Sequence, residues 1–163
     1  MGSSRRFGFA CTGGTFGPFH EGHEHLFYEA FQLSEHLFIR LTSDKYLAKY
    51  ARKVAQHVIP SQLERFYALQ KHLHEFYRGR FEILMLDERE ECENCDFRDL
   101  TKAIICGQDS VGKAYALNLK RRESGLYEVK IIGVPVKRSR DQQRISSSRI
   151  RCHEIDARGE LLI

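Results

Sequence analysis

A glycine-rich stretch between an apolar run and a helical pattern constrains this chain more than any other feature. The stretch covers residues 13–23 and reads Gly-Gly-Thr-Phe-Gly-Pro-Phe-His-Glu-Gly-His. Residues 7–12 before it are typical of a buried strand, and a helix is expected from about Glu21. A strand, a glycine turn and a helix point backbone N–H groups and the positive end of the helix dipole at one place. The arrangement predicts an oxyanion site at the carboxyl end of the first strand.

The two histidines of this stretch support the same interpretation. His20 and His23 are three residues apart, and residues at that spacing lie on the same side of a helical turn. Glycines at positions 13, 14 and 22 let a ligand approach the backbone closely. A glycine turn with two surface histidines is the plain alternative. The paired glycines, the threonine and the strand–turn–helix context together favour the anion site.

The rest of the chain alternates strand and helix patterns. Strands are expected at residues 7–12, 37–41, 80–86, 102–107 and 129–136, and helices at about 21–34, from 44 onward, at 60–77 and at 109–124. This alternation predicts an α/β fold with a parallel sheet and helices on both faces. A chain of 163 residues suits a single domain over 1–163, with residues 1–6 as a disordered or tag-derived extension.

A second predicted anion site lies near the end of the chain. Ser146, Ser147 and Ser148 precede a helical run, and arginines follow at 149 and 151. Hydroxyls and free N–H groups at a helix start, with cations beside them, suit a phosphate. An ordinary helix cap is the alternative for this motif taken alone. If a doubly wound sheet has the strand order 3-2-1-4-5, the first and fifth strands bring both motifs to one cleft.

Basic residues follow the second predicted strand, over residues 45–57. They fit either a solvated helix face or a cationic flap. Because strand ends on one side of a parallel sheet cluster, Lys49 and Lys53 are candidates to reach the same ligand as His20, and the sequence does not choose between them. Arg121, late in the helix at 109–124, fits either dipole complementation or nucleotide contact.

Composition argues against several classes of protein. The formal net charge of +4 and the pI near 8.8 suit a protein that binds small polyphosphates and are too mild for a nucleic-acid specialist. The sequence has no apolar run near the roughly 18 residues of a membrane span, and no secretory signal pattern. Five cysteines at uneven spacing make a disulfide framework improbable. We therefore expect a cytoplasmic protein without nucleic-acid or membrane partners.

Cys92 and Cys95 form a lone Cys-x-x-Cys within a polar, acidic loop at 87–99. The pair fits half of a structural zinc site, a redox pair, or two ordinary loop cysteines. The last interpretation is favoured because no second pair of cysteines stands near in the sequence.

The glycine-rich stretch also resembles a known signature. Gly14-Thr15-Phe16 followed by His20-Glu21-Gly22-His23 resembles the signature of the HxGH nucleotidyltransferase superfamily. Members join a nucleoside triphosphate to a phosphate-bearing acceptor and release pyrophosphate. The resemblance implies a Rossmann-like sheet and contact of both histidines with the triphosphate. Gly17 departs from the pattern, because many members carry Asp or Asn there.

The serine motif, Ile145 to Arg151, is similar to the carboxyl-terminal motif of the same superfamily, and especially of phosphopantetheine adenylyltransferases. Weaker matches favour the archaeal and eukaryotic branch: Thr42-Ser43-Asp44, Glu64-Arg65, Asn118 with Arg121, Gly125-Leu126, and Glu154 to Leu161. The resemblance covers about residues 7–162. It implies that ATP and 4′-phosphopantetheine react to give dephospho-CoA and pyrophosphate. Mg²⁺ would arrive with ATP, without metal ligands from the protein.

The resemblance further implies roles for particular residues. The predicted catalytic residues are His20, His23, Lys49 and Lys53. The predicted nucleotide-binding residues are Gly14, Thr15, Phe16, His23, Gly107, Arg121, Ser146, Ser147 and Ser148. The predicted acceptor-binding residues are Thr15, Thr42 and Lys49.

Two alternative functions stay open at this point. One is a different nucleotidyltransferase of the same superfamily, such as a cytidylyltransferase or an FAD- or NAD-forming adenylyltransferase. The other is a catalytically weakened nucleotide-binding protein, which Gly17 motivates. A homo-oligomer is a further expectation.

Overall fold

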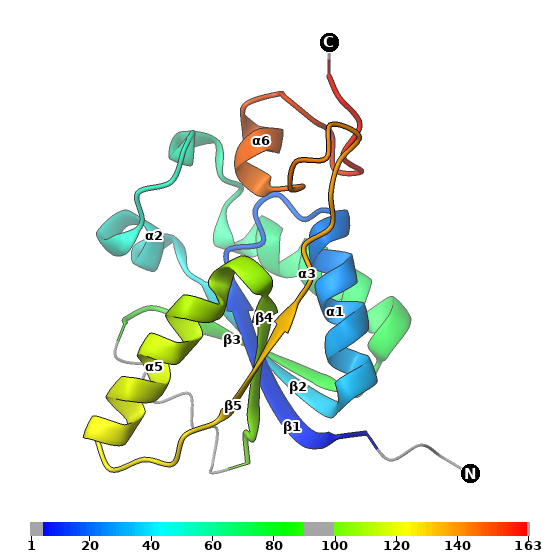
Figure 1. The fold of residues 1–163 in the computed structure, drawn as a ribbon. Coiled ribbons are helices and arrows are strands. Elements are labelled where there is room, and N and C mark those ends of the chain that lie inside the picture. Colours follow the sequence, from blue (N-terminus) through cyan, green and yellow to red (C-terminus); the bar gives the residue numbers. More distant parts are fainter. Residues whose placement is uncertain (1–4, 90–99, 163) are drawn as a thin grey trace.

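Five parallel strands form the centre of the molecule. The computed structural model describes residues 5–89 and 100–162. The strands are β1 (Phe7–Gly14), β2 (Ser34–Thr42), β3 (Phe81–Leu86), β4 (Ala103–Gly107) and β5 (Lys130–Val134). They lie in the order β3-β2-β1-β4-β5, and each neighbouring pair is parallel (Figure 1). The predicted Rossmann-like doubly wound sheet of order 3-2-1-4-5 is confirmed.

Helices lie between the strands and after the last of them, near the predicted positions and with shifted ends, and two short 3-10 helices are also present among the described residues. They are α1 (Glu21–Leu33), α2 (Asp44–Tyr50), η1 (Gln56–Val58), α3 (Gln62–Tyr77), η2 (Gln108–Ser110), α5 (Val111–Glu123) and α6 (Ser147–Arg151). The expected start of α3 at Pro60 is two residues early, because Ser61 and Glu64 form a capping box that begins the helix at Gln62. Likewise, α2 ends at Tyr50 rather than continuing through the basic segment.

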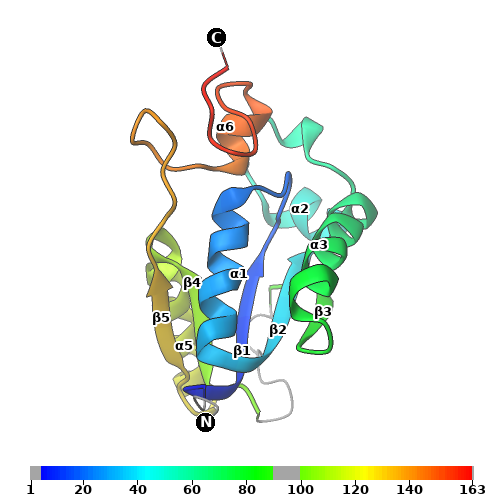
Figure 2. The same ribbon diagram turned by 90° about the vertical axis from the view of Figure 1, so that its right-hand side faces the viewer.

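Apolar side chains fill both faces of the sheet. On one face, Phe27 and Phe31 of α1 pack with Leu69 and Leu73 of α3 in a cluster of buried residues. On the other face, Ala114 of α5 belongs to a second, smaller cluster. Figures 1 and 2 show α1 and α3 on one side of the sheet and α5 on the opposite side. Burial of these side chains is the main force that holds the helices in place.

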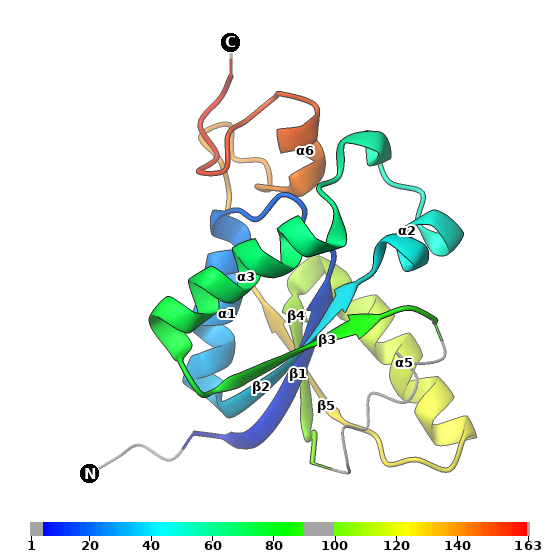
Figure 3. The same cartoon turned by 180° about the vertical axis from the view of Figure 1, so that it is seen from behind.

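All five strands end at the same edge of the sheet, and α6 lies beyond that edge (Figures 1 and 3). In the sheet, β2 lies on one side of β1, and β4, which comes later in the chain, lies on the other side. The connections therefore switch sides between β1 and β4, and ligands of open α/β sheets bind at such a point.

Some sequence predictions fall at or beyond the limits of the described residues. Cys92 and Cys95 lie outside them. At the amino end, Arg5 donates a hydrogen bond from Nε to the carbonyl of Phe31 at 2.9 Å. Across residues 5–89 and 100–162, no helix combines the length and apolar character needed to cross a membrane.

Candidate active site

His20 caps the first helix, and its ring lies over Gly22. The backbone of His20 is extended, with φ −154° and ψ 170°, and its Nδ1 accepts a hydrogen bond from the N–H of Gly22 at 3.1 Å. A Cβ atom on Gly22 would lie 2.9 Å from Cε1 and Nδ1 of the ring, so glycine is the residue that fits. Because Nδ1 accepts, we assign the proton of the neutral imidazole to Nε2, which then acts as a donor.

His23 is held by aromatic rings. Its ring stacks on His20 with centroids 3.7 Å apart and planes at 19°. Phe16 meets it edge-on at 4.9 Å, and Phe19 stacks on it at 5.5 Å. Within the described part of the chain, the buried Nδ1 of His23 has no hydrogen-bond partner. Packing, rather than a polar partner, therefore fixes the orientation of this ring.

Both histidines are neutral at neutral pH. Burial, and after it the positive charge of Arg144, lowers the pKa of His20 to about 4. Burial, the neighbouring His20 and Arg144 lower the pKa of His23 in the same way. Two stacked imidazoles can thus donate hydrogen bonds to an anion without repelling each other. The positive charge for the site must come from other side chains.

Lys49 has a carboxylate partner of its own. Its Nζ lies 2.8 Å from Oε2 of Glu88, a residue that follows β3. Glu88 also pairs with Lys45 at 2.8 Å and accepts a hydrogen bond from the hydroxyl of Tyr50. The hydrogen bond with Glu88 raises the pKa of Lys49, and these contacts lower the pKa of Glu88 to about 2. Glu88 therefore neutralises much of the positive charge on this side of α2.

Lys53 lies in positive surroundings instead. Desolvation lowers its pKa first, and the charges of Lys113, Arg151 and Arg144 lower it further. All three of these groups are cations. A polyphosphate would relieve their mutual repulsion. The structure thus distinguishes the two lysines, and Lys53 is the better candidate for a phosphate ligand.

Arg144 is a site residue that the sequence analysis missed. Its guanidinium pairs with Asp109, which follows β4. Its charge acts on His20, on His23 and on Lys53. Arg144 directly precedes the serine motif, and this position was the sequence signal for its role. Local patterns do not indicate where the side chain of an arginine in a polar loop points.

Arg65 of α3 explains the glycine at position 17. Its side chain is 1% exposed, and a Cβ atom on Gly17 would lie 2.7 Å from its Cδ. The guanidinium donates to the carbonyl oxygens of Thr15 and Thr42, at 3.0 and 2.6 Å, and pairs with Asp44 at 2.8 Å. The arginine therefore occupies the space that Asp or Asn at position 17 would need.

The loop after β1 and the end of β2 meet through their side chains as well. The hydroxyl of Thr42 donates to the hydroxyl of Thr15 at 3.0 Å. The structure thus brings together two of the three predicted acceptor-binding residues. The third, Lys49, is engaged with Glu88. The roles of all three stay predictions.

The serine motif folds against the glycine-rich loop. Ser146 caps α6 by accepting from a backbone N–H of that helix at 3.3 Å. Ser147 donates to the carbonyl of Pro18 at 2.9 Å, and Ser148 accepts from Arg151 at 3.2 Å. Arg151 also donates to the carbonyl of Gly17 at 2.6 Å. The two predicted phosphate motifs are therefore in contact, although their binding of phosphate stays a prediction.

The side chain of Phe16 is buried between Gly14 and the core. Its side chain is 3% exposed and lies against Gly14, where an added Cβ atom would be 3.1 Å from the ring. The ring also packs on Phe27 of the core. A nucleotide contact by Phe16, as predicted, would have to use its backbone N–H or carbonyl.

Gly107 and Arg121 lie at opposite ends of the β4–α5 unit. Gly107 ends β4 at the carboxyl edge, close to Asp109. Arg121 lies about 15 Å along the axis of α5 from Val111, and its Nε donates to the carbonyl of Tyr127 at 2.9 Å. Since α5 runs back along the sheet (Figure 1), the structure does not bring Arg121 to the histidines.

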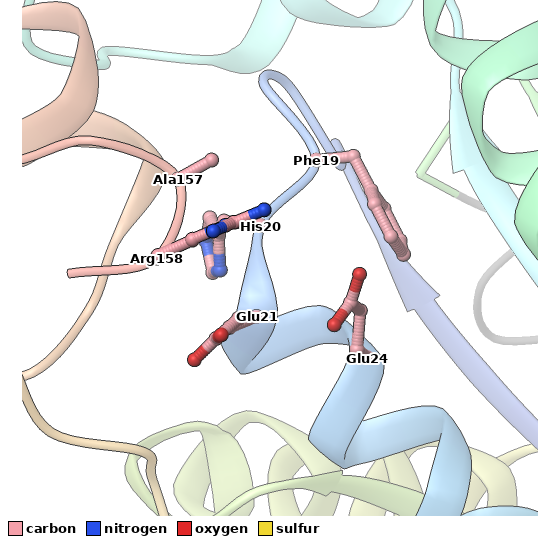
Figure 4. A pocket seen from close by; sticks show the side chains of 6 residues that line it. All are labelled: Phe19, His20, Glu21, Glu24, Ala157 and Arg158. Atoms are coloured by element: carbon pink, nitrogen blue, oxygen red, sulfur yellow. The ribbon is translucent and has the colours of Figure 1, made fainter.

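A cavity of about 350 Å³ adjoins His20. Phe19, Glu21 and Glu24 line it from the start of α1, and Ala157 and Arg158 line it from the carboxyl-terminal segment (Figure 4). The N–H of Glu21 donates to the carbonyl of Ala157 at 3.0 Å, which fixes this segment beside α1.

Comparison with known sequences gives consistent matches over most of the chain. Residues 11–153 match the family described as cytidylyltransferase-like. A phosphopantetheine adenylyltransferase of Methanothermobacter thermautotrophicus is 30% identical, over 97% of this chain and 92% of its own length. A phosphopantetheine adenylyltransferase of Pyrococcus horikoshii is 30% identical, over 95% of each chain.

Solved structures share the fold. A bifunctional NMN adenylyltransferase/ADP ribose pyrophosphatase from Francisella tularensis superimposes with a TM-score of 0.61 at 18% sequence identity. The match covers 90% of this chain and 41% of the other. At this identity the similarity concerns the arrangement of the strands and helices.

Proposed function

We propose that this chain, which belongs to the cytidylyltransferase-like family and within it to the phosphopantetheine adenylyltransferases, transfers AMP from ATP to 4′-phosphopantetheine. The products would be dephospho-CoA and pyrophosphate. The predicted family is confirmed. The observation that carries the proposal for the reaction is the juxtaposition of two neutral histidines with Arg144 and Lys53 at the carboxyl edge of the sheet.

The reaction asks for positioning and charge stabilisation. An oxygen of the acceptor phosphate attacks the α-phosphorus in line, and the bond to the bridging oxygen breaks. A phosphate is already a competent nucleophile, so no general base and no covalent enzyme intermediate are needed. The donors must instead meet the charge that develops on the phosphoryl oxygens.

The side chains divide this work between neutral donors and cations. Nε2 of His20 faces away from its capping bond and can donate to a phosphate oxygen. His23, whose orientation its ring neighbours fix, is proposed to lie nearest the α-phosphate. Lys53 lies among cations and supplies positive charge, whereas Glu88 takes up the charge of Lys49. We therefore assign the phosphate contact to Lys53 rather than Lys49.

MgATP is the proposed form of the nucleotide. In the described residues, no group of three or more His, Cys, Asp or Glu side chains is placed to hold a metal ion. The nearby carboxylate Asp109 is paired with Arg144. Mg²⁺ usually keeps its waters and phosphate ligands, so it can arrive with the triphosphate as part of the substrate.

Gly17, which stands where many family members carry Asp or Asn, was the reason to consider a catalytically weakened nucleotide-binding protein. Arg65 fills the space beside Gly17 and binds the carbonyl oxygens of Thr15 and Thr42, so the loop keeps a polar anchor from another element. We infer that the chain compensates for the missing polar side chain rather than losing the site. A cytoplasmic location and a homo-oligomeric state stay predictions, which cell fractionation and sedimentation would test.

Pyrophosphate release with Mg²⁺ tests the proposed reaction. ATP and CTP are each combined with 4′-phosphopantetheine, with nicotinamide mononucleotide and with flavin mononucleotide. Release with ATP and 4′-phosphopantetheine alone is expected. Release with another pair would retain the chemistry and correct the substrate, whereas no release from protein that binds ATP would indicate a binding protein.

Paired lysine variants test the assignment within the site. Lys53→Gln removes an exposed cation from positive surroundings and is expected to lower kcat/KM by roughly 10²-fold. Lys49→Gln removes the same charge four residues away, where Glu88 already neutralises it, and is expected to change kcat/KM by about twofold at most. The reverse order of effects would contradict the assignment.

A further inference from the structure

The backbone at Arg144 is anchored beside the start of α1. Arg144 forms an antiparallel bridge with Arg138, and the N–H of Ile145 donates to the carbonyl of Lys137 at 3.0 Å. The carbonyl oxygen of Ile145 would lie 3.5 Å from a Cβ atom on Gly22. Arg144 therefore emerges next to the glycine that separates the two histidines.

The side chain of Arg144 extends toward the end of β4. There it forms its ion pair with Asp109 of η2. The two side chains are 52% and 38% exposed, so the pair lies at the surface of the carboxyl edge. An exposed pair of this kind contributes only about 0–1 kcal/mol to stability. Stability alone therefore gives little reason for an arginine here.

The charge of Arg144 reaches the proposed active site from one side. It lowers the pKa of His20 and of His23, which belong to the start of α1, and of Lys53, which follows α2. Together with the pair to Asp109, these effects locate the guanidinium between α1, the end of β4 and the basic segment. A triphosphate that contacts the histidines would come within its reach.

We propose that Arg144 is a further catalytic residue, which binds the β- and γ-phosphates of ATP, and that Asp109 is its counter-ion until the nucleotide binds. This role rests on the adenylyl transfer proposed above. The electron pair of the broken bond between the α-phosphorus and the bridging oxygen leaves with pyrophosphate. The guanidinium fork matches phosphate oxygens, and its charge stabilises this leaving group. Because a triphosphate carries more negative charge than one carboxylate, it displaces Asp109.

Nucleotide binding without acceptor provides the test. MgATP and AMP are titrated against wild type, Arg144→Gln and the control Arg140→Gln, which removes an exposed arginine paired with Glu160 in the same segment. Arg144→Gln is expected to weaken MgATP binding by about 10²-fold and AMP binding by about twofold at most, because AMP lacks the β- and γ-phosphates. Arg140→Gln is expected to match wild type. Unchanged MgATP affinity in Arg144→Gln, or equal loss for both nucleotides, would overturn the proposal.

Asp109→Asn tests the counter-ion role. If the carboxylate only balances Arg144, this variant binds MgATP at least as tightly as wild type. If Asp109→Asn loses as much MgATP affinity as Arg144→Gln, Asp109 holds the arginine in place. That result would overturn the proposal that the triphosphate displaces Asp109 from Arg144. These titrations contain no acceptor, so a selective loss of MgATP in Arg144→Gln stands even if 4′-phosphopantetheine fails as a substrate. These two results together would mean that the acceptor is wrongly assigned and that Arg144 still binds the β- and γ-phosphates.

Discussion

The buried His20 should make the stability of this protein depend on pH between about pH 6.5 and about pH 4. Its pKa falls from 6.5 in the unfolded chain to about 4 in the fold, mainly because its ring is buried. Between those values the unfolded chain binds more protons than the folded one, so stability decreases as the pH falls. The stabilising contribution is complete above about pH 6.5 and is lost toward pH 4.

The size of the effect follows from the shift. Lowering the pH from about 8 to about 5 should reduce the free energy of unfolding by about 2 kcal/mol through His20 alone. Burial also lowers the pKa of His23, so this residue further reduces the free energy of unfolding as the pH falls. The carboxyl groups of Glu88 and Asp141 have pKa values lowered to about 2, so their pairs break mainly at lower pH.

Urea unfolding at a series of pH values measures this directly. His20→Asn retains a side chain that can cap α1 but does not titrate. Between about pH 8 and pH 5, the free energy of unfolding of this variant should fall by about 2 kcal/mol less than that of wild type. His74→Asn, at an exposed position of α3, is the matched control and should follow wild type. Parallel curves for wild type and His20→Asn would refute the reasoning, since they would mean that His20 titrates alike in both states.

Three further substitutions test the packing beside Gly17, the placement of Arg121 and the orientation of His23. Gly17→Asp should destabilise the fold by roughly 1–3 kcal/mol in urea unfolding, because its Cβ would overlap the fully buried Arg65; an unchanged midpoint would mean that the arginine moves aside freely. Arg121→Gln should change MgATP affinity by about twofold at most, because this residue lies at the far end of α5; a tenfold loss would restore its predicted nucleotide contact. Phe16→Leu should lower kcat by about tenfold with little change in KM, because it loosens the ring of His23; an equal change in both constants would point to a binding defect instead.

Local patterns were sufficient for the sheet and for placing the glycine-rich stretch and the serine motif at the same edge of it. The alternation of apolar runs and helical patterns gave the five strands, and the glycine turn marked the end of β1. The pair His20 and His23 was singled out because residues three apart share one side of a helical turn and because the paired glycines and the strand–turn–helix context supported an anion site. Element ends were less accurate: β2 begins at Ser34, which the helical pattern had included in α1.

Contacts between distant residues could not be predicted from local patterns. Lys49 and Lys53 look alike in sequence, and the position of Glu88 beyond β3 and the cations around Lys53 separate them. The glycine at position 17 became understandable once Arg65, from a helix later in the chain, was seen beside it. Arg144 was missed for the same reason, since its partner Asp109 lies on another element.

The paired histidines are proposed to support adenylyl transfer to 4′-phosphopantetheine. The most direct measurement follows dephospho-CoA and pyrophosphate by mass spectrometry after mixing the protein with MgATP and 4′-phosphopantetheine, for wild type and His23→Ala. Wild type should form equal amounts of the two products, and His23→Ala should turn over roughly 10²–10³-fold more slowly. Wild-type turnover in His23→Ala, or pyrophosphate without dephospho-CoA, would contradict this proposal.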